Sequence, residues 1–195
     1  MTIFGITGGS GSGKTLASSM FAELGIEIID ADAVSREVTN KGSKCLNELV
    51  EYFGNEILQT DGTLNRRHLA SIAFSDVEKT KMLNTITHKY IKDKVSDIIA
   101  NSTAELAAID GAVIIGSIFE QDCEFIVSVI ADRDIRAERI KERDKLTDFQ
   151  VAQRLDAQPN EEFYRSHSRY IIQNNGTEQE LKKQVADVYS RIKEV

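Results

Sequence analysis

Residues Gly8–Thr15 have the types and the spacing of a loop that binds phosphate groups. They read GGSGSGKT and match the pattern G-x-x-x-x-G-K-[ST]. Glycines allow successive backbone N–H groups to point into one concavity, and a helix that starts there adds partial positive charge. Lys14 is placed to reach the β- and γ-phosphates of a nucleotide, and the Thr15 hydroxyl is placed to ligate Mg²⁺.

The flanking sequence supports the same interpretation of this loop. A short apolar run precedes it and a helical pattern follows it, and these two conditions separate such a loop from a flexible Gly/Ser turn. We therefore expect contacts with a bound nucleotide from Gly9, Ser10, Gly11, Ser12, Gly13, Lys14, Thr15 and Leu16.

Asp30 and Asp32 are candidates for work on a phosphoryl acceptor. Transfer of a phosphoryl group to a hydroxyl benefits from a carboxylate that orients the hydroxyl and accepts its proton. The two carboxylates point the same way only if a strand continues through Ala31, and they diverge if the chain turns at Asp30. The alternative for either residue is that it only caps the helix expected from Ala33 onward.

Asp110 and a row of arginines are the other chemical candidates. Asp110 ends the apolar run LAAID, as a magnesium-supporting carboxylate beside a phosphate loop does, but such a residue can equally just end a strand. Arg136, Arg139 and Arg143 fall at i, i+3 and i+7, on one helix face. Arginine offers planar paired donors to the charge on a transferring phosphoryl group. The interleaved acidic residues leave open a solvated helix of ion pairs.

Short apolar runs predict the strands that must position these residues. They are Thr2–Thr7, Ile26–Ile29, Leu106–Ile109 and Phe125–Ile130, with Tyr170–Ile172 as a weaker candidate. A helical pattern separates the first two runs and is closed by Gly25. Strand, loop, helix and strand within about 30 residues indicate a βαβ unit, and hence an α/β fold with a parallel sheet.

The rest of the chain divides into segments that differ in strand signal, polarity and charge. Residues 42–101 have almost no strand signal and carry an apolar stripe from Leu83 to Ile99, so we expect a helical insertion. Residues 144–167 are polar, dense in charge and contain the single proline, which favours a mobile lid. The remaining segments, 1–41, 102–143 and 168–195, are expected to form the nucleotide-binding core.

Composition excludes several classes of function. The chain has 195 residues with 24 Lys+Arg against 31 Asp+Glu, a formal charge of −7, which argues against nucleic acid as a partner. No apolar run approaches the roughly 20 residues needed to span a bilayer. The N-terminus MTIFGITGG shows no export signal, and two distant cysteines form neither a disulfide framework nor a metal cluster. We expect a cytoplasmic protein without membrane partners, a monomer or a weak homo-oligomer.

Several motifs together resemble a known family. They are TGGSGSGKT, LG-x4-DAD-x3-R, FG-x6-DGTLNRRHL, ITHKYI, R-x3-RD and NNG, in this order from about Ile3 to Val185. In this set the chain resembles dephospho-CoA kinase. The resemblance implies ATP-dependent phosphorylation of the 3′-hydroxyl of dephospho-CoA, the last step of coenzyme A synthesis, with ATP and Mg²⁺. It also implies a three-layer P-loop kinase core, a helical CoA-binding domain at 42–101 and a short lid.

The resemblance also assigns roles to residues. It implies that Asp32 is the catalytic base and that Arg139 and Arg143 lie over the transferring phosphoryl group, beside Lys14. It places Arg66 and His88 on the side of the acceptor, dephospho-CoA.

The chain departs from the family pattern at several positions. Ser10 stands where a bulky apolar residue is usual, and Lys89 follows His88 where proline is usual. Ala112–Gly116 replaces P-L-L-F-E, so its glutamate is absent and Glu120 comes four residues late. Two alternatives remain: a related P-loop kinase of a nucleoside or nucleotide, and a nucleotide-dependent switch or non-enzymatic paralogue. The absence of a guanine-binding N-K-x-D pattern speaks against the switch.

Overall fold

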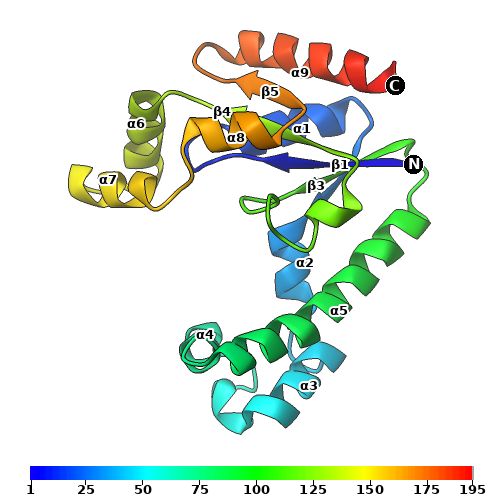
Figure 1. Ribbon diagram of the computed structural model, residues 1–195, viewed down its shortest axis with the longest axis vertical. Helices are drawn as coiled ribbons and strands as arrows, with labels where there is room; N and C mark the ends of the chain where they lie inside the picture. The colour runs from blue at the N-terminus through cyan, green and yellow to red at the C-terminus, as the bar shows by residue number, and fades with distance from the viewer. Residues whose placement is uncertain (195) are drawn as a thin grey trace. The chain divides into compact units, whose positions relative to one another are not determined.

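A five-stranded sheet organises the chain, whose residues 1–194 are described by a computed structural model (Figure 1). The strands are β1 (Thr2–Thr7), β2 (Glu27–Asp30), β3 (Leu106–Asp110), β4 (Phe125–Ile130) and β5 (Tyr170–Gln173). Their order is β2-β3-β1-β4-β5, with β1 parallel to β3 and β4, and β4 parallel to β5. The central strand β1 therefore delivers the Gly-rich loop from the middle of the sheet.

The chain forms two compact units. The first consists of Met1–Ile29 and the chain from Thr103 onward, and the second is Asp30–Ser102. The helices of the first unit are α1 (Lys14–Glu23), η2 (Glu120–Asp122), α6 (Arg133–Asp144), α7 (Asp148–Asp156), α8 (Glu161–His167) and α9 (Glu178–Lys193).

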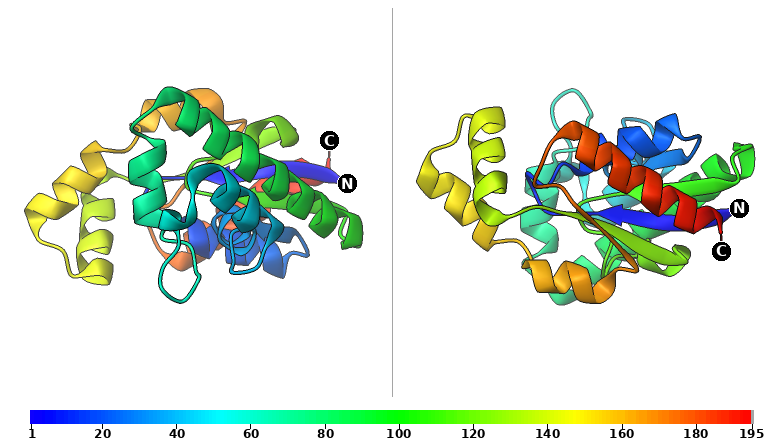
Figure 2. Two further views of the ribbon diagram at one scale, coloured as in Figure 1. Left: turned by 90° about the horizontal axis from the view of Figure 1, so that it is seen from below. Right: turned by 90° about the horizontal axis from the view of Figure 1, so that it is seen from above.

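Helices flank the sheet of the first unit. Helices α1 and α9 pack against each other, α8 packs against β4, and α6 and α7 form a side-by-side pair (Figures 1 and 2). The core between them holds Phe4 and Ile6 of β1, Phe21 of α1 and Leu181 of α9, all fully buried. Burial of β1 on all sides accounts for its continuous apolar sequence.

The second unit is built from helices. They are α2 (Ala31–Glu37), α3 (Lys44–Phe53), η1 (Asn55–Ile57), α4 (Arg66–Ala73) and α5 (Val77–Asn101). The long helix α5 packs against α2, α3 and α4. Cys45, Leu49 and Ile57 are buried in its core, and one isolated antiparallel bridge joins Leu58 to Leu64.

The α/β class and the parallel sheet flanked by helices are confirmed. All five expected strands form, including the weak one at Tyr170, and β2 is displaced by one residue toward Asp30. Gly25 follows the end of α1 with φ 86, the left-handed backbone that closes helices. The helix expected from Ala33 begins earlier, at Ala31, because the chain turns directly at Asp30.

Residues 144–167 are more regular than their polar composition suggests. They contain α7 and α8, and Val151, Leu155 and Tyr164 are buried there. Among residues 1–194, no helix combines the length and the apolar character that crossing a membrane requires.

Candidate active site

The Gly-rich loop joins β1 to α1 and turns on two glycines with left-handed backbone. Gly11 has φ 79 and Gly13 has φ 91, and Gly13 is the N-cap of α1. Only glycine adopts these angles without strain. Gly13 caps the helix without a side-chain hydrogen bond, so the amide groups of the first turn of α1 remain available for an anion.

Three side chains hold the carbonyl groups of this loop. Arg136 donates to Ser10 O at 2.9 Å, Arg139 donates to Gly11 O at 3.2 Å, and Asn174 donates to Ser12 O at 2.8 Å. Asn174 directly follows β5, and its residue is only 6% exposed. With the carbonyl oxygens engaged in this way, the peptide planes of the loop are fixed before any phosphate arrives.

Lys14 and Asp110 lie together at the loop. The Lys14 ammonium donates to the Asp110 carboxylate, and their side chains are 18% and 13% exposed. Thr15, the next residue of α1, is exposed. The described residues contain no group of three or more His, Cys, Asp or Glu side chains arranged for a metal ion.

The donor set of this loop nevertheless fits Mg²⁺. That ion is usually held by one or two protein ligands together with substrate phosphates and water, rather than by a closed protein cage. A threonine hydroxyl at the start of α1 and a carboxylate at the end of β3 supply such a partial set.

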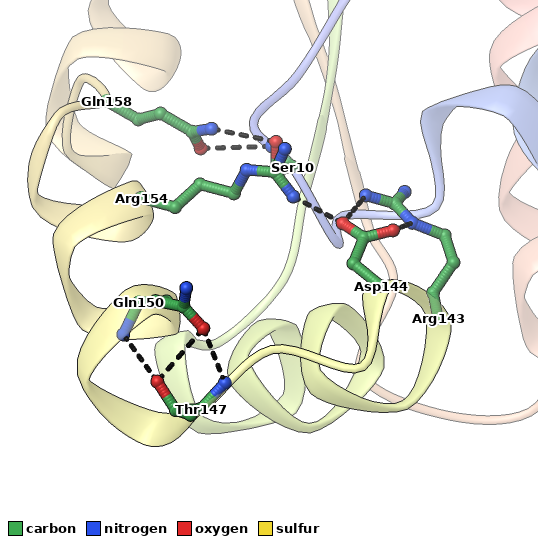
Figure 3. A network of polar contacts seen from close by, with 7 residues as sticks. All are labelled: Ser10, Arg143, Asp144, Thr147, Gln150, Arg154 and Gln158. Carbon is green, nitrogen blue, oxygen red and sulfur yellow. Dashed lines mark hydrogen bonds and ion pairs between the residues drawn. The ribbon is translucent and has the colours of Figure 1, made fainter.

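The arginines expected on one face of α6 have different partners. Arg136 and Arg139 reach the loop, whereas Arg143 donates to Asp144 through Nε at 2.7 Å and Nη2 at 2.8 Å (Figure 3). Arg154 of α7 donates to the same carboxylate. These bonds, that of Arg143 first, lower the pKa of Asp144 to about 2. Arg143 thus forms an ion pair of the kind that one alternative expected, whereas Arg136 and Arg139 bond to carbonyl oxygens of the loop.

Asp30 and Asp32 diverge in the structure. Asp30 is the N-cap of α2, and its carboxylate accepts from Ala33 N at 2.8 Å. Asp32 lies exposed in the first turn of α2, and within residues 1–194 its carboxylate has no hydrogen bond or ion pair. The helix dipole favours a negative charge at this place. One aspartate therefore has a capping role and the other is free for chemistry.

Arg66 and His88 also lie in the second unit. Arg66 donates to Thr39 Oγ1 at 2.6 Å and to Arg36 O at 3.2 Å. His88 lines a shallow groove along α5 with Thr80, Lys81 and neighbouring residues. Burial, and secondarily the charge of Lys92, lowers the pKa of His88 below its ordinary value.

The departures from the family pattern have structural counterparts. Lys89 donates to Glu48 Oε2 at 3.2 Å, and Tyr90 donates to the same oxygen at 2.6 Å, which ties α5 to α3. Glu120 accepts from Gly116 N at 2.7 Å and so closes the turn between them. Glu120 is thereby occupied within its own loop.

Sequence reasoning missed three residues that hold the Gly-rich loop. The pattern assigns Arg136, like the other arginines on its helix face, to the transferring phosphoryl group rather than to loop backbone, and it gives Gln158 no role. Asn174 belongs to the NNG motif, which was a usable signal. Its neighbour Asn175 accepts from Asp132 N at 2.8 Å, so the motif joins the loop to the start of α6.

The sheet order and the loop with its Lys14–Asp110 pair define a P-loop kinase fold. A solved Acinetobacter baumannii shikimate kinase shares this fold, with 16% identity and a TM-score of 0.54 over 98% of this chain and 93% of that one. A Campylobacter jejuni dephospho-CoA kinase shares it with 21% identity and a TM-score of 0.59 over 98% and 97% of the two chains.

The chain belongs to the dephospho-CoA kinase family. The sequence model of that family, described as dephospho-CoA kinase, matches residues 2–180. A Corynebacterium glutamicum dephospho-CoA kinase is 34% identical over 98% of this chain and 100% of its own length. A Listeria monocytogenes dephospho-CoA kinase is 34% identical over 96% and 95% of the two chains.

Proposed function

We propose that this protein transfers the γ-phosphoryl group of ATP to the 3′-hydroxyl of dephospho-CoA and releases coenzyme A and ADP. Family membership over nearly the whole chain is the observation that carries the proposal. The P-loop with its paired Lys14 supplies the nucleotide site that such a reaction needs.

The residues of the first unit bind and polarise the nucleotide. Backbone N–H groups of the later part of the loop and of the first turn of α1 cradle the phosphates, and Lys14 adds a point charge at the β- and γ-phosphates. Thr15 and Asp110 would hold Mg²⁺, which neutralises charge that develops on the phosphate oxygens. Arg139 and Arg143 stabilise the transferring group, and for this Arg143 exchanges Asp144 for phosphate.

The residues of the second unit handle the acceptor. Asp32 orients the 3′-hydroxyl and accepts its proton, a role that its exposed and unpartnered carboxylate supports. Arg66 and His88 bind dephospho-CoA. In this assignment residues 42–101 form the CoA-binding domain and residues 144–167 form a lid over the nucleotide. The protein acts as a cytoplasmic monomer or weak homo-oligomer.

The decisive experiment mixes the full chain with ATP, Mg²⁺ and dephospho-CoA and follows coenzyme A by mass. Parallel reactions replace the acceptor with AMP, uridine or shikimate. We expect coenzyme A to form from dephospho-CoA and no phosphorylated product to form from the other acceptors. Phosphorylation of another acceptor in place of dephospho-CoA would contradict the proposal.

A further inference from the structure

Gln158 contacts the P-loop from the short link between α7 and α8. Its Oε1 accepts from Ser10 N at 3.0 Å, and its Nε2 donates to Ser10 Oγ at 2.8 Å (Figure 3). Both the oxygen and the nitrogen of the Gln158 side-chain amide therefore form hydrogen bonds with Ser10. This double contact requires a hydroxyl at position 10, where the chain has serine instead of the bulky apolar residue common in the family.

Arg136 completes the arrangement. Its Nε donates to Ser10 O, and its Nη2 donates to Gln158 Oε1. Every polar atom of Ser10, its N–H, carbonyl and hydroxyl, therefore has a partner outside the loop. A residue held at all three points cannot rotate its peptide planes without breaking several bonds.

The packing at Gly9 shows how closely this cluster approaches the loop. A Cβ at Gly9 would lie only 2.8 Å from Gln158 Oε1 and would collide with Arg136 as well. Ordinary side-chain atoms do not approach a Cβ this closely. Gly9 is thus needed so that Gln158 and Arg136 can reach the backbone beside it.

The charge of Arg136 is directed at the loop. Its bonds go to the neutral oxygens of Ser10 and Gln158, and no carboxylate of residues 1–194 forms an ion pair with it. Burial accordingly lowers the pKa of Arg136, although an arginine stays charged at neutral pH. The positive charge is then left to act on an anion in the loop.

We propose that Gln158 is a positioning residue for ATP: through Ser10 and Arg136 it holds the P-loop in its phosphate-binding form. Because Ser10 N–H is occupied by Gln158, phosphate recognition falls to the later amides of the loop. When Ser10 is held in place, the position of the backbone N–H groups that follow it in the loop is held as well. The inference deepens the proposed function at its nucleotide side and does not depend on which acceptor is used.

The test measures the equilibrium binding of ATP to the full chain by calorimetry, without any acceptor present. We expect Gln158→Leu to weaken ATP binding about tenfold, since two hydrogen bonds to a loop and one to a charged group are lost. The melting temperature and the KM for dephospho-CoA should stay within error of the parent. Gln153→Leu, an exposed change on the neighbouring helix α7, is the matched control and should leave binding unchanged.

A double-mutant cycle with Ser10→Ala separates positioning from general stability. Ser10→Ala alone removes one of the contacts and should weaken ATP binding about threefold. Combined with Gln158→Leu it should add nothing, because both changes break the same contact. Fully multiplicative effects, or ATP binding by Gln158→Leu within twofold of the parent, would overturn the proposal. Loss of thermal stability in Gln158→Leu with Ser10→Ala neutral would also overturn it, since Gln158 would then support the fold alone. Failure of the proposed acceptor reaction would leave these binding results unaffected.

Discussion

Lys14 Nζ is paired with Asp110 Oδ1, so the phosphate-binding lysine and the carboxylate at the end of β3 share one ion pair. The pair joins the first residue of α1 to the strand beside β1. It places the proposed magnesium-supporting carboxylate beside the lysine of the P-loop. In the proposed function, Lys14 exchanges this contact for phosphate and Asp110 exchanges it for Mg²⁺.

Asp110→Asn should separate these two effects. Loss of the carboxylate frees Lys14 for phosphate but removes a proposed ligand of Mg²⁺, so ATP binding without the metal should be kept or tightened. The Mg²⁺-dependent rate should fall about 100-fold or more, in line with loss of metal-assisted charge stabilisation. Binding by calorimetry with and without Mg²⁺, together with kcat, checks this. Asp97→Asn, an exposed change on α5, is the control. An unchanged Mg²⁺-dependent rate would remove Asp110 from the metal role.

Asp32 and Asp30 offer a matched pair of substitutions two residues apart. Asp32→Asn should lower kcat by about 10²–10⁴-fold with the affinity for ATP kept, because a general base is lost. Asp30→Asn should keep most activity, because asparagine caps a helix about as well as aspartate. Steady-state kinetics with ATP titrations test both. If the two variants lose activity equally, Asp32 has no special role.

The ion pairs of Asp144 at the end of α6 should make the free energy of unfolding depend on pH in the acidic range. Its pKa is lowered to about 2 by Arg143 and Arg154, whereas an unfolded aspartate titrates near about 3.9. The stabilisation is therefore present above the unfolded value and is lost as the pH falls toward the folded one. Urea unfolding of the parent and of Asp144→Asn should show a difference at pH 5 that shrinks at pH 3. A difference constant over this range would contradict the ion pair as its source.

His88 should contribute a loss of stability at mildly acidic pH. Burial lowers its pKa in the folded protein, so below about 6.5 the unfolded chain takes up a proton that the folded one resists. The free energy of unfolding should thus fall between pH 7.5 and pH 5.5, and less so in His88→Gln. An NMR titration of the ring that gives an ordinary histidine pKa would rule this out.

Local pattern was sufficient for much of the fold. The apolar runs, the Gly-rich loop and the glycine after α1 are signals carried within a few residues, and the structure confirms the elements they predict. The partners of Arg136, Gln158 and Asn174 were not accessible in that way. Each donates to or accepts from loop backbone more than 100 positions away, and a backbone group has no residue-type signature to match.

The two carboxylates of the DAD motif show a different limit. Their spacing was compatible with one shared direction or with divergence, and the choice depended on where β2 ends. A boundary shift of one or two residues decides this, and boundaries are what single-sequence patterns define least well. The capping bond of Asp30 to Ala33 resolves it.

The position of β1 in the sheet has a consequence for how the protein is made. Within residues 1–194, β1 pairs with β3 and β4 alone, and its residue Phe4 lies beside Phe125. The Asp30–Ser102 unit, in contrast, is continuous in sequence. At typical elongation rates of about 5–20 residues per second, the apolar segment TIFGIT of β1 stays unpaired for several seconds until β3 and β4 have been synthesised. The central strand of the sheet is thus among the last to be paired, because both of its neighbours are synthesised after it.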